Sequence, residues 1–467
     1  MKNIKEKLKG KKITVMGLGL NRGGLGVTKF LAEAGAKVLV TDLKTEKELS
    51  SSLKKLEGFP IKYRLGEHKE EDFKSVDLII QNPGVPNNSR YLLVAKKNKI
   101  PIETDMGIFV QLCPSNNIIG IAGTKGKSTT TSLIHHLFKS AGRDVILAGN
   151  IGISVFDSLS LINKDTTVIL EISSWQLEGL KQHRFAPQIG VLTNVLPDHL
   201  DRYRDFKEYS EAEQLIYKYQ DKNDFLVLNR DQKITYQAAK KSKAKIFWFS
   251  DGKKINQGCF TKDGSIFSKI NSVEKEIIKI DEIPILGGHN LSNVLAACIP
   301  ALIYGILEKQ IKKGIKSFKG LPHRLEFIRD IRGVKAYNDS AATTPEACLF
   351  ALSSFSSPII LILGGKNKKM IFRELVKKIS ENKNIKKIIL LQHPNYDASE
   401  DILKEVEKLK IEDSVIISPG MEQAVKVASS LSKKGDIIVL SPAAASFGMF
   451  VNEFDRGRQF IKAIKKI

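Results

Sequence analysis

The chain has 467 residues, 42% of them hydrophobic, which predicts two or three well-packed globular domains rather than a disordered chain. Its 74 lysines and arginines exceed the 51 acidic residues, and the formal net charge is +23. Such a charge favours acidic partners. The cations are nevertheless spread along the whole chain and form no compact stripe with interleaved aromatic residues, so we expect no nucleic-acid partner.

The spacing of the cysteines and the length of the apolar stretches indicate where in the cell the protein is expected. The four cysteines, Cys113, Cys259, Cys298 and Cys348, are far apart, so neither a zinc knuckle nor a disulfide framework is predicted. The basic N-terminus lacks the apolar segment of a signal peptide, and the apolar stretch 294–307 is too short to span a bilayer. We therefore expect a cytoplasmic protein without stable membrane insertion.

A strand, a glycine-rich turn and a helix open the chain. The strand is expected over 13–16, the turn over 17–24 and the end of the helix at Ala34, and a second strand over 37–42 ends in an acid. This order is typical of a dinucleotide-type fold and predicts a pocket for a nucleotide or sugar nucleotide. Asp42 would lie near a ribose or base; the alternative is an acid that only caps the strand.

The first domain continues with the strand VDLIIQ, which ends at the turn Asn82-Pro83-Gly84. The carboxyl edge of an open α/β sheet is where ligands bind, so this turn is a candidate for the same pocket. The domain is expected to close near Cys113-Pro114.

A second glycine-rich loop lies within the stretch 117–141. An apolar strand enters it, Gly123 and Gly126 form the turn, and apolar residues at helical spacing follow. Backbone N–H groups of such a loop and of the helix N-terminus bind phosphate. The spacing departs from G-x-x-x-x-G-K-[ST] because Ile121 occupies the place of the first glycine. The alternative is a strand–helix joint without a ligand.

Polar side chains follow this loop at the ends of later strands. Lys127 can reach the outer phosphates, and the Ser128 hydroxyl can hold Mg²⁺. Glu171 closes the apolar strand TTVILE, where a carboxylate can hold Mg²⁺ directly or through water. His199 lies in a polar loop after the strand IGVLTNV, which favours a functional over a structural role. Asn290 begins a helix and would either contact adenine or ribose, or only cap the helix.

The remaining chain contains one further sheet unit. Residues 240–285 are expected to form a small β excursion without a chemical motif. After the linker 320–324, strands and helices alternate again to residue 441, which predicts a second parallel sheet. The expected fold is therefore α/β with three domains: a Rossmann-like N-terminal domain (1–114), a central P-loop ATPase-type domain (115–320) and a C-terminal Rossmann-like domain (321–467).

The order and spacing of these motifs resemble the Mur ligase family throughout the chain. Two of them, GLPHR and NDS-x-AT, are most similar to the D-glutamate-adding members. The segments that carry the resemblance are GTKGKSTTT (123–131), GNIG (149–152), LEISSWQLE (170–178), TNVLPDHLDRY (193–203), HNLSN (289–293), GLPHRLE (320–326), YNDSAATTPEA (337–347), LGGKNKK (363–369) and SPAAASFGMFVNEFDRG (441–457).

The resemblance implies a ligase of peptidoglycan precursor synthesis. ATP would phosphorylate the carboxylate of UDP-N-acetylmuramoyl-L-alanine, and the amine of D-glutamate would attack the acyl phosphate to form an amide. The implied cofactors are ATP and Mg²⁺, the implied partners are the two substrates, and we expect a monomer.

The resemblance also implies site residues. Lys127, Glu171, His199 and Glu213 would be catalytic, and Mg²⁺ would be held by Ser128, Glu171, His199 and Glu213. ATP would be bound by Gly123, Thr124, Lys125, Gly126, Lys127, Ser128, Thr129, Asn290, Asn293, Arg324 and Asp339. The UDP-sugar would contact Leu18, Leu20, Asn21, Asp42, Gly84, Asn150 and Ser173. D-Glutamate would meet Thr343, Lys368, Ser446 and Phe447.

Two positions depart from the family pattern. The family places a lysine, carbamylated to act as an acidic metal ligand, where Glu213 stands in the helix from Tyr209 to Tyr217. Glutamate has the right charge but is roughly 3–4 Å shorter. Our hypothesis is that Glu213 replaces the carbamate and makes the enzyme independent of bicarbonate; the alternative is an exposed helix glutamate. Ala341 stands where the family has a second lysine, which leaves the amino-acid specificity open.

Three alternatives are kept. The first is another amino-acid ligase of the same architecture, either a different Mur-type ligase or a folylpolyglutamate synthase-like enzyme. A folylpolyglutamate synthase-like enzyme needs no UDP pocket, so the glycine turn and Asp42 of the first domain argue against it. A nucleic-acid-stimulated P-loop ATPase would suit the net charge and predicts a steep dependence on salt. A binding module without chemistry is disfavoured by Glu171 and His199 beside the loop.

Overall fold

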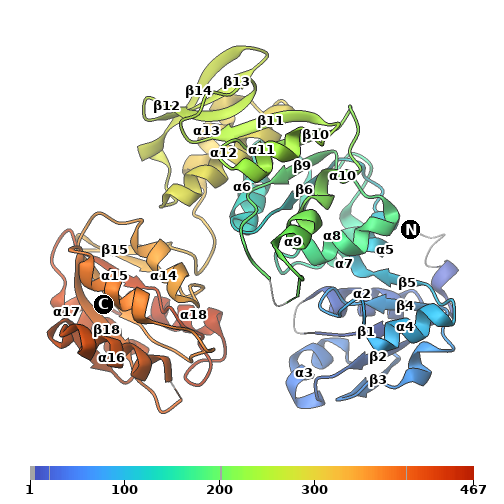
Figure 1. The fold of residues 1–467 in the computed structure, drawn as a ribbon, viewed down its shortest axis with the longest axis horizontal. Helices are drawn as coiled ribbons and strands as arrows, with labels where there is room; N and C mark the ends of the chain where they lie inside the picture. The colour runs from blue at the N-terminus through green and yellow to red at the C-terminus, as the bar shows by residue number, and fades with distance from the viewer. Residues whose placement is uncertain (1–5, 20–21, 200–201, 396) are drawn as a thin grey trace. The chain divides into compact units, whose positions relative to one another are not determined.

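A computed structural model describes residues 6–19, 22–199, 202–395 and 397–467, which form two compact units (Figure 1). The first unit contains the chain up to Ile280 together with Ser292–Ile315. The second contains Asp281–Leu291 together with Lys316–Ile467. No helix among the described residues is long and apolar enough to cross a membrane.

The first sheet of the first unit has five parallel strands in the order β3-β2-β1-β4-β5. Its inner strands are apolar on both faces because helices cover both sides of a parallel sheet. The strands are β1 (Lys12–Met16), β2 (Lys37–Asp42), β3 (Ile61–Leu65), β4 (Leu78–Gln81) and β5 (Ile102–Thr104), and the helices are α2 (Arg22–Glu33), α3 (Glu46–Leu53), α4 (Arg90–Lys97) and α5 (Asp105–Leu112).

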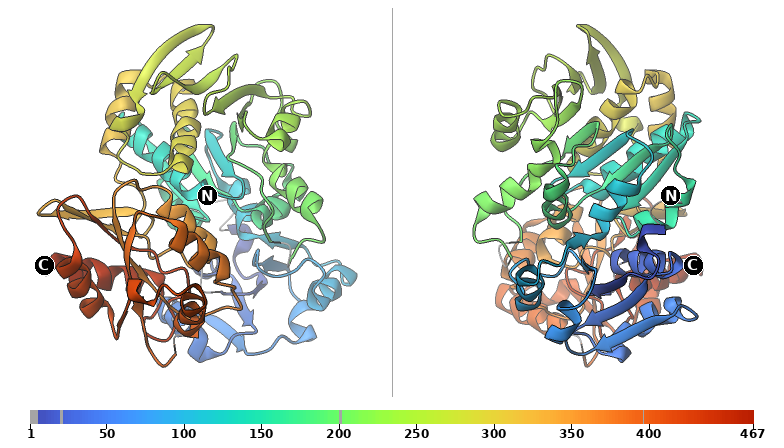
Figure 2. Two further views of the ribbon diagram at one scale, coloured as in Figure 1. Left: turned by 60° about the vertical axis from the view of Figure 1, so that its left-hand side comes forward. Right: turned by 90° about the vertical axis from the view of Figure 1, so that its right-hand side faces the viewer.

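The second sheet of this unit has nine strands in the order β14-β13-β12-β11-β10-β9-β6-β8-β7. Its strands run from cyan to yellow-green in Figure 2. All five residues of its inner strands β6 and β8 are buried. The strands are β6 (Ile118–Ala122), β7 (Val145–Gly149), β8 (Thr167–Glu171), β9 (Ile189–Leu192), β10 (Phe225–Asn229), β11 (Lys245–Ser250), β12 (Gly258–Lys262), β13 (Ser265–Ile270) and β14 (Val273–Lys279).

The β excursion expected over 240–285 is part of this nine-stranded sheet. Strands β11 and β12 continue the parallel order beside β10, and in this sheet the antiparallel pairs are β12–β13 and β13–β14. The helices that follow the strands are α6 (Lys127–Ser140), α7 (Val155–Ser158), α8 (Ser174–Leu180), α9 (Phe206–Glu213), α10 (Leu215–Lys218), α11 (Lys233–Ala239), α12 (Gly288–Ile303) and α13 (Glu308–Ser317).

The second unit has one six-stranded sheet in the order β15-β16-β20-β17-β18-β19. Five strands are parallel, as expected, and the antiparallel edge strand β15 is an addition to the prediction. The strands are β15 (Glu326–Ile331), β16 (Val334–Asn338), β17 (Ile359–Leu363), β18 (Ile385–Leu391), β19 (Val415–Ser418) and β20 (Ile437–Leu440), and the helices are α14 (Pro345–Leu352), α15 (Arg373–Glu381), α16 (Asp397–Leu409), α17 (Met421–Leu431) and α18 (Glu453–Lys465).

The two sheets of the first unit are joined through helices. Helix α2 packs on α7, and α5 packs on α8. The first contact is very close, because a Cβ atom at Gly26 would lie 1.9 Å from Ser154 Oγ. Only glycine fits at this point of α2.

We predict that Gly26→Ala lowers the free energy of unfolding by about 1–3 kcal/mol, because the added methyl group overpacks the contact. Urea unfolding followed by circular dichroism measures the change. Adding Ser154→Gly removes the opposing side chain and restores most of the stability. Gly288→Ala is the control, since a Cβ there meets nothing within 4 Å. Equal stability of Gly26→Ala and the wild type would contradict the prediction.

Candidate active site

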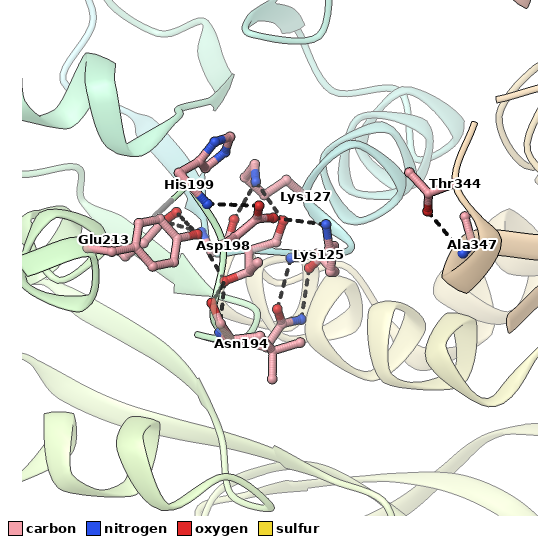
Figure 3. Close-up of polar contacts among 12 residues, drawn as sticks. Lys125, Lys127, Asn194, Asp198, His199, Glu213, Thr344 and Ala347 are labelled. Atoms are coloured by element: carbon pink, nitrogen blue, oxygen red, sulfur yellow. Dashed lines mark hydrogen bonds and ion pairs between the residues drawn. The ribbon is translucent and has the colours of Figure 1, made fainter. Parts of the chain in front are cut away.

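The phosphate loop joins β6 to α6 as the sequence predicts (Figure 3). Both of its glycines have positive φ, +122° at Gly123 and +84° at Gly126. A Cβ atom would lie 2.3 Å from Thr193 Oγ1 at the first and 2.2 Å from Asn293 Oδ1 at the second. Backbone angle and close packing therefore both require glycine here.

Glu213 holds the start of this loop. Its carboxylate accepts the Gly123 N–H at 2.8 Å and the Tyr209 hydroxyl at 2.9 Å. The Tyr209 hydroxyl also lies 2.9 Å from Thr124 Oγ1. Glu213 is 1% exposed, so it is not the exposed helix glutamate that the sequence left open. Burial raises the pKa of its carboxyl group, and the Lys127 charge and both hydrogen bonds oppose that rise.

Asn194 holds the middle of the loop. Its amide oxygen accepts the Lys125 N–H at 2.9 Å, and its amide nitrogen donates to the Lys125 carbonyl at 2.8 Å. The Lys125 ammonium forms an ion pair with Asp198 at 2.9 Å. The Lys127 ammonium donates to the loop carbonyls of Gly123 and Thr124. The Lys127 charge therefore lies at the loop, where a polyphosphate would need it, whereas the Lys125 charge is paired with Asp198.

Glu171 lies beside the phosphate loop because β8 and β6 are neighbours, with Glu171 opposite Ile121. Asn150 Nδ2 donates to Glu171 Oε1 at 3.0 Å. Glu171 is 2% exposed, and its Oε2 atom has no hydrogen-bond partner among the described residues. A buried carboxylate oxygen without a partner is costly. A divalent cation would satisfy it.

The site therefore fits a magnesium ion that enters with its nucleotide. No group of three or more His, Cys, Asp or Glu side chains in the described part of the chain forms a ready-made metal site. Magnesium commonly uses one or two carboxylates together with phosphate oxygens and water. Glu171 and Ser128, in the first turn of α6, are the residues that match this requirement.

His199 has a left-handed backbone with φ of 53°, and its N–H donates to Asp198 Oδ1 at 2.9 Å. Its ring centre lies 5.3 Å from that of Trp175 and 6.0 Å from that of Tyr209. Figure 3 shows His199 beside Asp198 at this edge of the loop. The exposed imidazole is thus oriented by aromatic rings that the sequence analysis did not assign to the site.

Asp42 shapes the glycine turn of the first sheet. Its carboxylate accepts the N–H groups of Leu18 at 2.9 Å, Gly19 at 3.0 Å and Lys44 at 2.9 Å. Both oxygens are therefore used by the main chain, which supports the structural alternative for Asp42. Its contact with a UDP-sugar stays a prediction.

The other residues predicted at the UDP-sugar divide between two sheets. Gly84 belongs to the turn after β4, and its N–H donates to Asn82 Oδ1 at 3.0 Å. Ser173 caps α8 by accepting the Gln176 N–H at 3.3 Å. Arg202 bridges these regions, because it donates to the Pro83 carbonyl at 2.8 Å and stacks on Trp175. Leu20 and Asn21 lie outside the described residues.

The predicted ATP residues divide between the two units. Asn293 belongs to the first unit and accepts the Thr130 hydroxyl at 3.3 Å. Asn290, Arg324 and Asp339 belong to the second. Asn290 is the third residue of α12, and its Nδ2 donates to the Leu286 carbonyl at 2.7 Å. A helix N-cap accepts a main-chain N–H instead, so this bond is not the expected cap.

Asp339 is buried and accepts two hydrogen bonds. The Leu325 N–H donates at 3.1 Å and the Ser441 hydroxyl at 2.8 Å. Burial nevertheless raises the pKa of Asp339 from its usual 3.8 to about 7, against the lowering effect of both donors and of the Arg324 charge.

The residues predicted for D-glutamate lie in three loops of the second unit. Thr343 follows β16, Lys368 follows β17, and Ser446 and Phe447 follow β20. The Lys368 ammonium lies 4.8 Å from the centre of the Phe447 ring, so the structure brings these two side chains together. Ala341 donates its N–H to the His323 carbonyl at 3.0 Å.

A small cluster of basic and aromatic side chains lies directly after β10 and on β11 and α11. The expectation of no nucleic-acid partner stays a prediction. The Arg230 guanidinium lies 4.2 Å from the Tyr236 ring centre and 5.9 Å from that of Trp248, and Lys240 lies 5.7 Å from Tyr236. The sequence pattern did not indicate this cluster, because Arg230 follows β10, Tyr236 lies in α11 and Trp248 lies in β11. The Arg230 guanidinium thus lies near two aromatic rings of the protein itself.

The parallel sheets, the glycine-rich loop and the adjacent buried carboxylate define an α/β protein that binds nucleotide phosphates. Three family patterns cover most of the chain. The Mur ligase MurD-like N-terminal domain matches residues 11–104, the Mur ligase middle domain matches 121–301 and the Mur ligase glutamate ligase domain matches 323–444. The chain belongs to the Mur ligase family.

Individual relatives agree with this assignment. The UDP-N-acetylmuramoylalanine–D-glutamate ligase of Thermoanaerobacter sp. (strain X514) is 39% identical over 98% of this chain and 99% of its own. The enzyme of the same name from Roseiflexus sp. (strain RS-1) is 37% identical over the same shares. A crystal structure of UDP-N-acetylmuramate-alanine ligase from Thermotoga maritima is 18% identical, covers 98% of this chain and 99% of its own, and has a TM-score of 0.61. That likeness shows the shared fold.

We predict that Asp339 makes the protein less stable as the pH rises from 4 to 8. Its folded-state pKa of about 7 exceeds the usual 3.8, so its contribution to stability is full below pH 3.8 and is lost as the pH rises through 7. Asp339→Asn removes this dependence. Relative to the wild type, the variant should gain about 1–4 kcal/mol between pH 4 and pH 8, at 1.36 kcal/mol per pKa unit.

Urea unfolding without nucleotide at several pH values measures this gain. Asp330→Asn, in the edge strand β15, is the control because that carboxylate is exposed. If the free energy of unfolding changed with pH by the same amount in the wild type and in Asp339→Asn, the prediction would be wrong.

Proposed function

We propose that this chain is an ATP-dependent ligase that joins D-glutamate to UDP-N-acetylmuramoyl-L-alanine in peptidoglycan precursor synthesis, through an acyl-phosphate intermediate. The observation that carries the proposal is full-length similarity to relatives named for that reaction, in a chain that keeps the phosphate loop. The Mur ligase membership supports ATP use over a nucleic-acid-stimulated ATPase.

The residues of the phosphate loop bind and orient the polyphosphate. The Gly123 and Lys125 N–H groups are already bonded to Glu213 and Asn194. N–H groups in the first turn of α6 would donate to its oxygens, and Lys127 would add a cation. This charge neutralisation is the main contribution that a protein makes to phosphoryl transfer. His199, whose ring lies near those of Trp175 and Tyr209, would help to hold a magnesium ion near the substrate carboxylate.

Magnesium, when bound, supplies additional positive charge at the transferred phosphate. Glu171 would hold it through the oxygen that lacks a protein partner, and Ser128 would contribute its hydroxyl. Asn150 orients Glu171 from the opposite side through its 3.0 Å hydrogen bond.

We assign residues 1–114 to UDP-sugar binding, 115–320 to ATP and 321–467 to the amino acid. The five-stranded, nine-stranded and six-stranded sheets support this division. In this proposal Thr343, Lys368, Ser446 and the backbone of Phe447 meet the D-glutamate carboxylates. A cytoplasmic location and a monomeric state stay predictions.

We further propose that Glu213 performs the work of a carbamylated lysine without bicarbonate. Its carboxylate is buried beside the phosphate loop, and the Lys127 charge acts on it. Its carboxylate oxygens accept from the Gly123 N–H and the Tyr209 hydroxyl, so it would act on a metal ion through a water.

The test of Glu213 compares activity in bicarbonate-free buffer with and without added bicarbonate. The wild type should be unaffected by bicarbonate. Glu213→Gln should lose activity roughly 10- to 100-fold, because the charge beside the loop is removed. Glu211→Gln is the matched control, since Glu211 is exposed on the same helix. Wild-type stimulation by bicarbonate, or full activity of Glu213→Gln, would contradict the proposal.

The function itself is tested by phosphate release from ATP in the presence of UDP-N-acetylmuramoyl-L-alanine. We expect release with D-glutamate and none above background with L-glutamate, D-aspartate, L-lysine or meso-diaminopimelate. Release with another amino acid would move the protein to a different ligation step. No release with any of them would overturn the proposed activity.

A further inference from the structure

Three loops of the second unit leave neighbouring strands of one sheet. Strands β16, β20 and β17 are adjacent and parallel, so the loops that follow them emerge at the same edge. These loops carry the residues proposed to meet D-glutamate. Their mutual geometry therefore sets the shape of the amino-acid pocket.

One side chain from α18 contacts all three loops. Arg456 is 0% exposed, and its guanidinium donates to main-chain and hydroxyl oxygens. Nε donates to Ser340 Oγ at 3.0 Å and Nη2 to the Ser340 carbonyl at 2.9 Å, after β16. Nη1 donates to the Ala444 carbonyl at 2.9 Å, after β20, and to the Gly364 carbonyl at 3.5 Å, after β17.

Two of the loops are also joined directly. The Lys366 N–H donates to the Ala445 carbonyl at 2.8 Å, and the Ala445 N–H returns a bond to the Lys366 carbonyl at 3.2 Å. A Cβ atom at Gly365 would lie 2.2 Å from the Ala445 carbonyl oxygen, so the two main chains are in close contact. The loop after β16 has a different link, because Ser340 Oγ donates to the Glu453 carbonyl at 2.7 Å, at the start of α18.

The chemistry of this contact suits arginine alone. A guanidinium has five N–H donors in a rigid plane and stays charged at any pH a protein tolerates. Its donors reach the three loops in different directions from a single group. A lysine would offer three donors from one nitrogen and could not span the same oxygens.

We propose that Arg456 is a positioning residue of the amino-acid pocket: it holds the loops after β16, β17 and β20 in the arrangement that binds the incoming amino acid. The proposal rests on the proposed function for the identity of that amino acid. Arg456 is fully buried, so it acts through the loops.

The first test measures steady-state kinetics of Arg456→Lys with each substrate varied in turn. We expect the KM for D-glutamate to rise about tenfold or more, since small displacements of positioning groups have effects up to about 100-fold. The KM values for ATP and for UDP-N-acetylmuramoyl-L-alanine should stay within about twofold. Arg458→Lys is the matched control, because Arg458 lies on the same helix with 63% of its side chain exposed.

Ser340→Ala provides a milder variant should Arg456→Lys fold poorly. It removes the hydroxyl that accepts from Nε but leaves the Ser340 carbonyl, so it should raise the KM for D-glutamate by a smaller factor in the same direction. An unchanged KM for D-glutamate in a folded variant, or equal losses for all three substrates, would overturn the proposal.

Amide hydrogen exchange separates this proposal from the proposed function. In the substrate-free protein, Arg456→Lys should exchange faster than the wild type in residues 340–344, 364–368 and 442–447, with β18 unchanged. Unchanged exchange in these loops overturns the positioning role whatever the activity. Faster exchange in a protein that releases no phosphate with D-glutamate supports the positioning role and overturns the proposed function instead.

Discussion

The hydrogen bond from the Gly123 N–H to the Glu213 carboxylate lies at the start of the phosphate loop, out of contact with water. Both groups are buried, and a buried N–H or carboxylate without a hydrogen-bond partner lowers the stability of the fold. The fold therefore needs this hydrogen bond. A loop that binds phosphate must hold one conformation before the ligand arrives. The Asp42 carboxylate likewise accepts main-chain N–H groups of the first glycine turn. Arg456 has the opposite polarity, because its guanidinium donates to main-chain carbonyls of the loops it holds.

The parallel strands of the fold were predictable because burial on both faces leaves continuous apolar runs such as KVLVTD and PIILILGG. The edge strand β15 was not predicted, since its sequence EFIRDI mixes charged and apolar residues and most of it is partly exposed. The sequence also placed β11 in a separate excursion. Its apolar run KIFWFS carried the strand signal, but pairing partners depend on contacts distant in sequence.

The phosphate loop could be predicted because its strand, turn and helix are contiguous, and Glu171 because an acid ends the neighbouring apolar strand. The partners of Glu213 were not predictable, as its contact with Gly123 spans 90 residues. The separation between Arg456 and Ser340 is 116 residues. Asp42 was predicted near a ribose from its place after the strand, but three backbone donors already surround its carboxylate. Local sequence patterns thus indicate which residues lie at the carboxyl edge of a sheet. Their hydrogen-bond partners depend on residues distant in the sequence.

The charged sequence of β14 has a consequence for how molecules of this protein behave beside one another. The strand is the last of the nine-stranded sheet, and an open edge offers unpaired main-chain groups to any other strand. Its exposed residues Glu274, Lys275 and Glu276 place alternating charges along that edge, with Glu274 paired to Lys269. A second copy adding a strand here would have to desolvate those charges. The charged edge strand β14 thus disfavours aggregation through the nine-stranded sheet.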